Sequence, residues 1–444
     1  MSQLSKRLHK KIWSVHNWVG LYAGVVIAIL SLTGVVALFK FEIDEALNPS
    51  LYKVPIENQK VDLNPIIDSL NHVYGIENFG ILGIPQQEGK SWTVNYFVRK
   101  SQFDVKDWQI FLNPYNGKIV GLRDYYSSSG FFIRNLHVRL YEGFFGRQIV
   151  GLAGLALLLS TITGFWIYGR FMKKQLFASI RAKNLRVKMA DYHKLIGVTT
   201  LVFNLMIAIT GTWLGLQRFL QPAIAGGRPG LYKNDKPPIS KEEDAAYTID
   251  YHKAYEKARA IFPELKIKSL TPSTNGNRTI EVRGDVVRTA FERNAFRLLL
   301  DKKNLEEIYR YDVRSASLGD KAFYIQESMH FGDWGGIWLK ILYAFFGVTS
   351  GFLALTGFVV YLKRTEKKRK EHPKFVELKP LLWRWTIGIT AAVALLAILN
   401  TLYGVVIPTV IIVVSLYSSI VFLLLRALFL FARRKWQKRK MSIN

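Results

Sequence analysis

The feature that most constrains this chain is a series of runs of about 20 residues or more that contain no charged residue. As helices, such runs are long enough to cross the ~30 Å hydrocarbon core of a bilayer. They occupy residues 19–39, 149–168, 195–217 and 341–362, and a further uncharged stretch covers residues 385–425. That last stretch is about twice the spanning length and has turn-forming residues near its middle, so it predicts two helices. The sequence therefore predicts an α-helical membrane protein with six transmembrane helices.

Basic residues lie beside these runs rather than in one patch. The net charge of +28 over 444 residues would by itself also suit a nucleic-acid-binding protein. However, Lys and Arg cluster before the first run, between the second and third, after the fourth and at the end of the chain. By the positive-inside rule, both termini and these loops are predicted to be cytoplasmic. The long connections at residues 40–148 and 218–340 are then predicted to lie outside.

The absence of cysteine limits the chemistry of the chain. It excludes disulfides, thiolate metal sites and iron–sulfur clusters, so any redox chemistry needs another cofactor. The first uncharged run is longer than the apolar part of a signal peptide, and no small-residue cleavage site follows it. We therefore expect an uncleaved first span.

Each long external connection has the pattern of a small α+β module. In the first, a helix is predicted near residues 63–74, with strands at 91–98, 108–112 and 118–120 around an Asn113-Pro-Tyr-Asn-Gly117 turn. In the second, a helix is predicted at residues 251–261 and strands at 278–282 and 295–300. The two halves of the chain thus follow the same plan.

Four histidines stand at repeated distances from four glycines. The separation is 18 residues in two cases and 27 residues in the other two. The pairs are His16 with Gly34, His193 with Gly211, His137 with Gly164, and His330 with Gly357. These equal spacings predict an internal duplication of a unit that consists of a span, an external module and a second span.

The predicted topology brings the histidines together in pairs. His16 and His193 both open spans that start in the cytoplasm, whereas His137 and His330 precede spans that start outside. Each face thus receives one imidazole from each half, and two axial nitrogens are what a six-coordinate haem iron takes. Because both axial positions are then filled, we expect electron transfer rather than oxygen activation.

Two glycines and several cations fit the same hypothesis. Gly20 and Gly197 lie one turn beyond His16 and His193 on the same helix faces and would leave a flat slot for a macrocycle. Helix packing alone is the alternative interpretation of Gly20 and Gly24, which form a small-residue face on the first span. The candidate cations for the carboxylates of a haem are Lys10, Lys11 and Lys194 on the inner face and Arg134, Arg139 and Arg147 on the outer face.

Other roles for the histidines remain open at this point. They could be interfacial residues or make helix-packing hydrogen bonds without a metal. Zinc is a weaker candidate, because a two-histidine site is incomplete and neither Asp191 nor Asp333 has a counterpart in the other half. A single helix over residues 137–164 would measure about 40 Å, so His137 is predicted on a short helix broken from the span near Gly143 or Gly146.

Several motifs of the chain resemble the PepSY-associated transmembrane family. The resemblance covers about residues 6–364. It rests on these motifs: His16-Asn-Trp-Val-Gly20, Ser31-Leu-Thr-Gly34, Asn113-Pro-Tyr-Asn-Gly117, Leu136-His137, Thr163-Gly164-Phe-Trp, Tyr192-His193-Lys and Met329-His330. The family includes bacterial inner-membrane siderophore-iron reductases. The resemblance implies PepSY-like periplasmic domains, two haem b groups and electron transfer across the membrane to a ferric siderophore.

The predicted organisation then has seven parts. They are the N-terminus and first span (1–40), the first periplasmic domain (41–130), the outer histidine segment and second span (131–170), the basic loop and third span (171–217), the second periplasmic domain (218–327), the outer histidine segment and fourth span (328–364), and a linker, helical hairpin and basic tail (365–444). The hairpin departs from the simplest members of the family. No dinucleotide or flavin motif is present, so electrons must come from quinol or a separate cytoplasmic reductase.

Two other classes of function remain as alternatives, and no catalytic residue is assigned. In one, the PepSY-like domains bind a periplasmic peptide or protein and the spans only anchor and signal. In the other, the repeat builds a transporter. The four core spans lack internal carboxylates and an obvious broken helix pair, which makes the transporter the weaker alternative.

Overall fold

The computed structural model describes residues 3–58, 60–62, 64–74, 81–99, 105–141, 143–172, 179–181, 184–225, 249–272, 279–287, 289–291 and 293–371. The chain divides into two compact units. We call them the helical unit (residues 1–35, 135–215 and 345–444) and the sheet unit (residues 36–134 and 216–344). Each unit collects segments from both halves of the sequence. The predicted fifth and sixth spans, at residues 385–425, lie outside the described residues.

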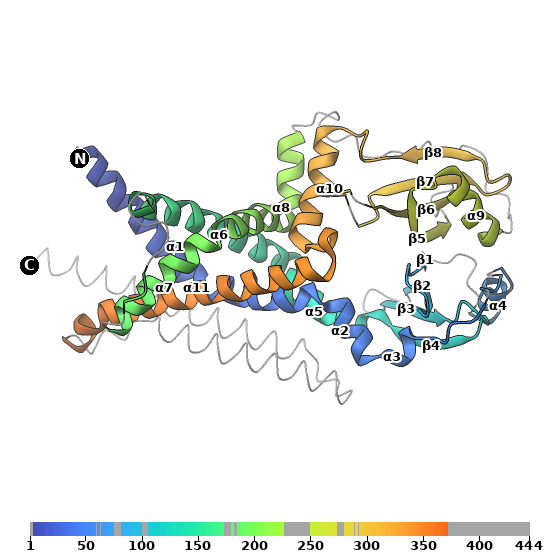
Figure 1. Ribbon diagram of the computed structural model, residues 1–444, viewed down its shortest axis with the longest axis horizontal. Helices are drawn as coiled ribbons and strands as arrows, with labels where there is room; N and C mark the ends of the chain where they lie inside the picture. The colour runs from blue at the N-terminus through green and yellow to red at the C-terminus, as the bar shows by residue number, and fades with distance from the viewer. Residues whose placement is uncertain are drawn as a thin grey trace, which may run out of the picture. The chain divides into compact units, whose positions relative to one another are not determined.

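Long apolar helices form the helical unit (Figure 1). They are α1 (Gln3–Leu38), α6 (Gly143–Met172), α7 (Leu185–Thr199), α8 (Leu201–Ala225) and α11 (Gly336–Glu371). By length and composition, α1, α6 and α11 can each cross a membrane, and α7 with α8 passes as a fourth span that is bent by 69°. The first four predicted spans therefore coincide with apolar helices.

Close contacts between small residues hold these helices together. A Cβ atom added to Gly215 of α8 would lie 2.2 Å from the Cα atom of Gly151 of α6. One added to Gly347 of α11 would lie 2.6 Å from a methyl group of Val35 of α1. In a membrane, where apolar side chains gain little by leaving lipid, such backbone approach is a main source of helix association.

The bend between α7 and α8 carries a buried polar network. The chain bends at Thr200, whose hydroxyl donates to the carbonyl of Ile196. The amide of Asn204 donates to the Thr200 hydroxyl, and Ser350 of α11 donates to the amide oxygen of Asn204. All three residues are buried. Hydroxyls that bond back to a preceding carbonyl commonly accompany helix bending, so this network accounts for the break in the third span.

Two short helices carry the other two histidines that stand at a repeated distance from a glycine. His137 lies near the end of α5 (Ser129–Arg139), and His330 lies near the end of α10 (Leu318–Phe331). Leu140 and Tyr141 follow α5 with φ angles of 47° and 63°, and left-handed residues cannot continue a helix. The predicted break between His137 and the second span is therefore confirmed. It begins slightly before Gly143, where α6 starts.

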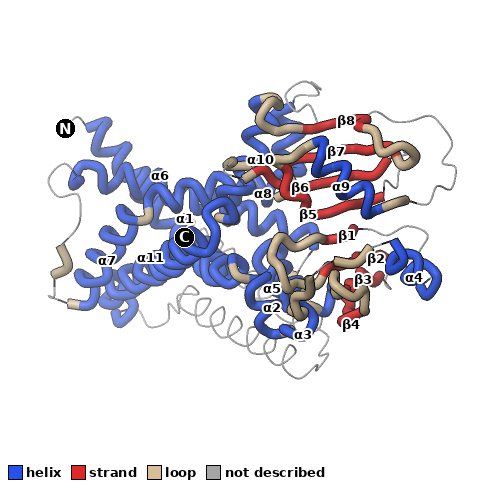
Figure 2. The backbone as a smooth tube through the Cα atoms, turned by 45° about the vertical axis from the view of Figure 1, so that its right-hand side comes forward, coloured by secondary structure: helices blue, strands red, loops and turns tan. Residues whose placement is uncertain are grey.

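The sheet unit contains one eight-stranded antiparallel sheet, in the order β4-β3-β2-β1-β5-β6-β7-β8 (Figures 1 and 2). The strands are β1 (Ile81–Gly83), β2 (Trp92–Arg99), β3 (Val105–Leu112), β4 (Ile119–Asp124), β5 (Leu265–Pro272), β6 (Thr279–Val286), β7 (Phe296–Asp301) and β8 (Glu307–Tyr311). Strands of the first half occupy one side of the sheet and strands of the second half the other. Pairing of Leu82 with Leu270 and of Gly83 with Ser269 joins them.

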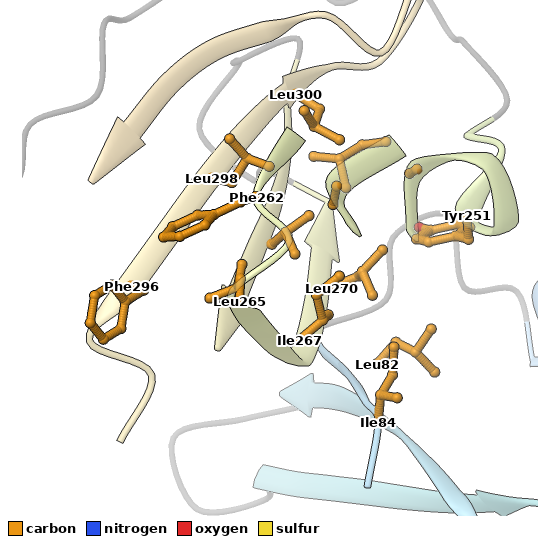
Figure 3. Packing of buried hydrophobic residues seen from close by; sticks show 14 of the residues in the cluster. Leu82, Ile84, Tyr251, Phe262, Leu265, Ile267, Leu270, Phe296, Leu298 and Leu300 are labelled. Atoms are coloured by element: carbon orange, nitrogen blue, oxygen red, sulfur yellow. The ribbon is translucent and has the colours of Figure 1, made fainter. Parts of the chain in front are cut away.

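The core of the sheet unit is continuous across this junction. Leu82 and Ile84 of the first half lie beside Ile267 and Leu270 of the second half (Figure 3). The helix α9 (Tyr251–Ile261) packs on β5, β6 and β7, and α4 (Asn64–Tyr74) contributes to the same cluster. The five strands predicted from alternation are present, and both helices are confirmed. The strands β1, β5 and β8 were not predicted; β1 is only three residues long, and one of its two partners, β5, is distant in sequence.

A buried carboxylate fixes the segment that follows the first span. This segment comprises α2 (Lys40–Leu47) and α3 (Pro49–Tyr52). Elsewhere in the same unit, the short 3-10 helix η1 (Tyr125–Ser127) follows β4. Asp44 is 3% exposed and accepts two hydrogen bonds from Arg123 of β4, of 2.6 and 3.0 Å. Tyr52 and Ser129 also donate to it. Burial would raise the pKa of Asp44, but the bonds from Arg123, Tyr52 and Ser129 lower it below its usual value.

Candidate functional site

A cavity of about 370 Å³ lies among the helices of the helical unit. Its lining comes from α1, α6, α7, α8 and α11 and includes two of the predicted ligands, His16 and His193. The wall is mainly apolar. This size and composition are typical of sites for cofactors and small molecules.

Two histidines face this cavity from matched niches. Nδ1 of His16 lies 3.0 Å from the carbonyl oxygen of Ser160 and 3.1 Å from the hydroxyl oxygen of Thr163. Nδ1 of His193 lies 3.0 Å from the carbonyl oxygen of Leu353 and 3.1 Å from the hydroxyl oxygen of Thr356. Each histidine thus uses the same two kinds of atom on the neighbouring helix.

These hydrogen bonds determine which ring nitrogen carries the proton. A carbonyl oxygen can only accept, so Nδ1 of each imidazole is the donor. Nε2 of a neutral imidazole is then unprotonated and has a free lone pair. Metal-bound histidines are usually held in this way, with the second nitrogen donating to a carbonyl or carboxylate.

The two imidazoles are close enough to share one ligand. Their ring centroids are 6.2 Å apart and the ring planes are inclined by 79°. When two imidazoles coordinate one metal ion from opposite sides, with each ring nitrogen about 2 Å from the metal, their ring centroids are about 6 Å apart. The separation of His16 and His193 therefore fits a shared metal.

Glycines make both niches possible. A Cβ atom added to Gly164 would lie 3.1 Å from Cε1 of His16, and one added to Gly357 would lie 3.2 Å from Cε1 of His193. These are the glycines that the repeated spacing singled out, and each directly follows the threonine of its niche. Because a side chain here would press on the imidazole, glycine allows the Cε1–Nδ1 edge of each ring to approach the adjacent helix closely.

Gly20 and Gly197 have a different environment. Both line the cavity. A Cβ atom on Gly20 would meet nothing within 4 Å, and one on Gly197 would meet only a methyl group of Leu353 at 3.9 Å. Helix packing, which was the alternative interpretation of Gly20 and Gly24, therefore does not require Gly20 or Gly197 among the described residues. They leave open space beside the two histidines.

Two cations lie at the cavity. Lys194 lines it and is 3.6 Å from Asp191, which also pairs with Arg181 at 2.8 Å. Arg364 lines it too, lies over the ring of Trp13 and donates to Asn17. Lys194 was predicted from the sequence, whereas Arg364 was not. Arg147, another predicted cation, donates instead to the carbonyl oxygen of Leu214.

The other two histidines belong to different units. His137 is in the helical unit, where its Nδ1 lies 3.2 Å from the hydroxyl oxygen of Thr33 and its Cε1 would be 2.9 Å from a Cβ atom on Gly34. His330 is in the sheet unit, where its ring packs against Phe331. His137 thus has a third Thr-Gly niche. The pairing of His137 with His330 stays a prediction.

Threonines are the site residues that the sequence reasoning missed. Thr163, Thr356 and Thr33 each precede a glycine of the repeat and each contact a histidine. The repeated Thr-Gly dipeptide was visible in the sequence, but it gave no indication of which histidine it would meet. Within the described residues, no group of three or more His, Asp or Glu side chains converges that could hold a bare metal ion.

Comparison with known proteins places the chain among membrane proteins with PepSY-associated spans. Residues 13–364 match the family described as the PepSY-associated TM region, and the chain belongs to this family. A relative in Pseudomonas aeruginosa, the uncharacterized protein PA4219, is 27% identical over 288 residues. That match covers 59% of this chain and 70% of the relative.

Proposed function

We propose that this chain is a membrane-bound haem protein that carries electrons across the bilayer. The observation that supports this most is the pair His16 and His193, whose Nδ1 atoms donate to backbone carbonyls beside one apolar cavity and whose rings are 6.2 Å apart. This donor set fits a haem, which needs two axial nitrogens and a mostly apolar pocket. It suits bare zinc less well, because two further ligands would be needed.

The residues around the cavity have distinct roles in this proposal. The carbonyls of Ser160 and Leu353 hold each imidazole in the tautomer that presents Nε2. Gly20 and Gly197 keep the space beside the rings open. Arg364 and Lys194 supply positive charge for the carboxylates of the ligand. A haem with both axial positions filled supplies one-electron transfer and offers no open position to a substrate.

The wider proposal follows the predicted topology. The protein would have six spans in the bacterial inner membrane, with both termini cytoplasmic and the sheet unit in the periplasm. His137 and His330 would bind a second haem b nearer the periplasm. Electrons would pass from quinol or a cytoplasmic reductase to a periplasmic acceptor, for which we propose a ferric siderophore.

A reduced-minus-oxidised visible spectrum tests the central claim. The full chain, expressed with adequate haem and purified in detergent, is expected to show the bands of low-spin haem b. A pyridine haemochrome assay should give about two haems per chain, since four histidines provide two axial pairs. The His252→Ala variant is a suitable control, because His252 is exposed on α9 and outside both pairs.

The opposite result would support a partner-binding module instead. In that case the purified chain would contain no haem, and alanine at His16, His193, His137 or His330 would leave its stability and its partners unchanged. For the acceptor, the reduced protein should be reoxidised by a ferric siderophore. Reoxidation no faster than by buffer alone would contradict the assigned acceptor and leave the haem proposal intact.

A further inference from the structure

Lys40 is an unusual lysine because its side chain is almost fully buried. It is the first residue of α2 and follows α1 closely in the chain. Its exposed fraction is 8%. Lysines normally bury only the aliphatic part of the side chain and keep the ammonium in water, and full burial is rare without a partner.

Aromatic rings surround the ammonium of Lys40. Its Nζ atom lies 4.7 Å from the ring centroid of Phe41 and 5.8 Å from that of Phe331. The guanidinium of Arg293 lies 3.8 Å from the same Phe331 ring. Two cations therefore share one aromatic side chain. The rings stabilise positive charge but cannot neutralise it.

The acidic groups in this region are engaged by other cations. Asp333 pairs with Arg293 at 2.6 Å, and Glu42 pairs with Lys340 at 2.7 Å. Glu327 lies 3.9 Å from Arg293. Within the described part of the chain, the ammonium of Lys40 makes no hydrogen bond and no ion pair. The sheet unit thus holds a lysine whose side chain is largely buried and whose ammonium has no direct counter-ion among the described residues, although Asp333 attracts it at longer range.

We propose that Lys40 is the centre of an oxyanion-binding site in the sheet unit, which takes a phosphate or carboxylate group. Lysine binds such groups as a compact point charge, and a bound anion would supply the missing counter-charge. The anion can come from a phospholipid headgroup or from a soluble ligand. The first source is reasonable because the apolar helix α1 ends at Leu38, where headgroups begin on the proposed topology.

The surroundings of Lys40 disfavour its charged form. Burial, together with repulsion from Arg293, Arg134 and Lys340, lowers the pKa of Lys40 from 10.5 to about 8, whereas Asp333 acts in the opposite direction. Glu42 and Glu327 remain bound to Lys340 and Arg293. An anion bound at Lys40 favours the charged form, so its affinity should fall as the pH rises through about 8.

Thermal unfolding of the full-length protein in nanodiscs tests this site. Sulfate is the soluble probe, compared with chloride at equal ionic strength, and the discs contain phosphatidylcholine with or without phosphatidylglycerol. The test variant is Lys40→Met, which keeps the packing against Phe41 and Phe331. The matched control is Lys118→Met, because Lys118 is exposed in the turn before β4.

The expected result is a stabilisation of the wild type and of Lys118→Met, by at least about 2 °C, that Lys40→Met lacks. Sulfate also stabilises proteins by exclusion, but that contribution is the same in all three proteins. A response to sulfate in both kinds of disc indicates a soluble anion. A response to phosphatidylglycerol, after which sulfate stabilises the wild type no more than it stabilises Lys40→Met, indicates a headgroup. Equal responses of Lys40→Met and Lys118→Met to both probes overturn the proposal.

A second measurement covers a Lys40→Met variant that does not fold. The wild type alone should respond more strongly at pH 7 than at pH 9, because its ammonium loses a proton between these values. Lys40→Arg keeps the charge at both pH values, so its response should not change. A wild-type response that is the same at pH 7 and pH 9 would contradict the site.

Discussion

The two halves of the chain hold their cavity histidines alike but line the cavity differently. In both halves, a histidine donates to a carbonyl and packs on a Thr-Gly pair of the neighbouring helix. Eleven residues after the histidine, however, the first half has Ile27 and the second has Asn204. Asn204 is bonded to Ser350, whereas the residue at the position in the first half that matches Ser350 is Leu157.

All four of these residues line the same cavity. One side of it is therefore apolar, and the other carries a hydrogen-bonded pair next to the bend at Thr200. The helix α1 of the first half is continuous, whereas the corresponding span of the second half is bent by 69°. The two halves thus hold their histidines in the same way, but the helix that follows the histidine takes a different path in each half. Four predictions test this distinction, beginning with the largest expected effect.

Replacement of either cavity histidine should abolish the binding of one haem, to the same extent in both variants. His16→Ala and His193→Ala are each expected to lose about one haem per chain, because a bis-histidine haem needs both nitrogens. Haemochrome assays against His252→Ala measure this. If one variant keeps two haems while the other loses one, the two histidines are not equivalent ligands.

Alanine at the niche glycines should weaken haem binding without removing a ligand. In Gly164→Ala and Gly357→Ala, the new methyl group lies 3.1 or 3.2 Å from a histidine ring, and overpacking of this kind costs about 1–3 kcal/mol. We expect about 10-fold or more faster haem loss to apomyoglobin in both variants.

A control for this prediction is Gly169→Ala on α6, whose methyl group would meet no described protein atom within 4 Å and which does not line the cavity. It should fold as well as the wild type. Equal haem loss from Gly164→Ala and the wild type would show that the niche tolerates a side chain and would contradict the proposed packing.

Replacement of the polar pair Asn204 and Ser350 should show that the second half depends on these residues for stability in a way that the first half does not. Asn204→Ile leaves the Thr200 and Ser350 hydroxyls without the amide and should cost about 1–2 kcal/mol of unfolding free energy. The double variant Asn204→Ile with Ser350→Leu, which copies the first half, should cost less than the sum of its single variants. Chemical denaturation in detergent micelles measures these differences.

The reverse exchange provides the contrast. Ile27→Asn places an amide against the apolar side of the cavity, so we expect it to destabilise the protein by about 1–3 kcal/mol. If the costs of the two single variants simply add in the double variant, and if Ile27→Asn and Asn204→Ile destabilise the protein equally, the polar pair has no structural role of its own.

Removal of the niche hydroxyls should have the smallest effect. Thr163→Val and Thr356→Val each remove one of two acceptors for a histidine Nδ1, while the carbonyl remains. A cost of about 0.5–1.5 kcal/mol is expected, equal in the two halves. Spectroelectrochemical titration should show a shift of the potential of one haem only. Unequal shifts would indicate that the bend in the second half also alters its niche.

Much of the fold could be predicted because its signals are local. The uncharged runs located α1, α6 and α11, and the alternation of apolar residues located β2, β3, β6 and β7. The break before Gly143 followed from length alone, since one helix from His137 to Gly164 would exceed the membrane thickness. The bend at Thr200 contradicts the expectation that the core spans contain no broken helix pair; its network includes Ser350, which donates to Asn204 from a distant segment.

For the candidate site, too, one part could be predicted from the sequence and another part could not. The sequence by itself determined which histidines and glycines stand at equal spacings, because such spacings are read directly along the chain. Only the tertiary structure decided that His16 meets Thr163 and Gly164, that Gly20 is free of packing contacts, and that strands from both halves form one sheet. Hydropathy and spacing report the environment of each segment in turn, whereas the choice of partner depends on long-range packing between segments that the sequence keeps apart.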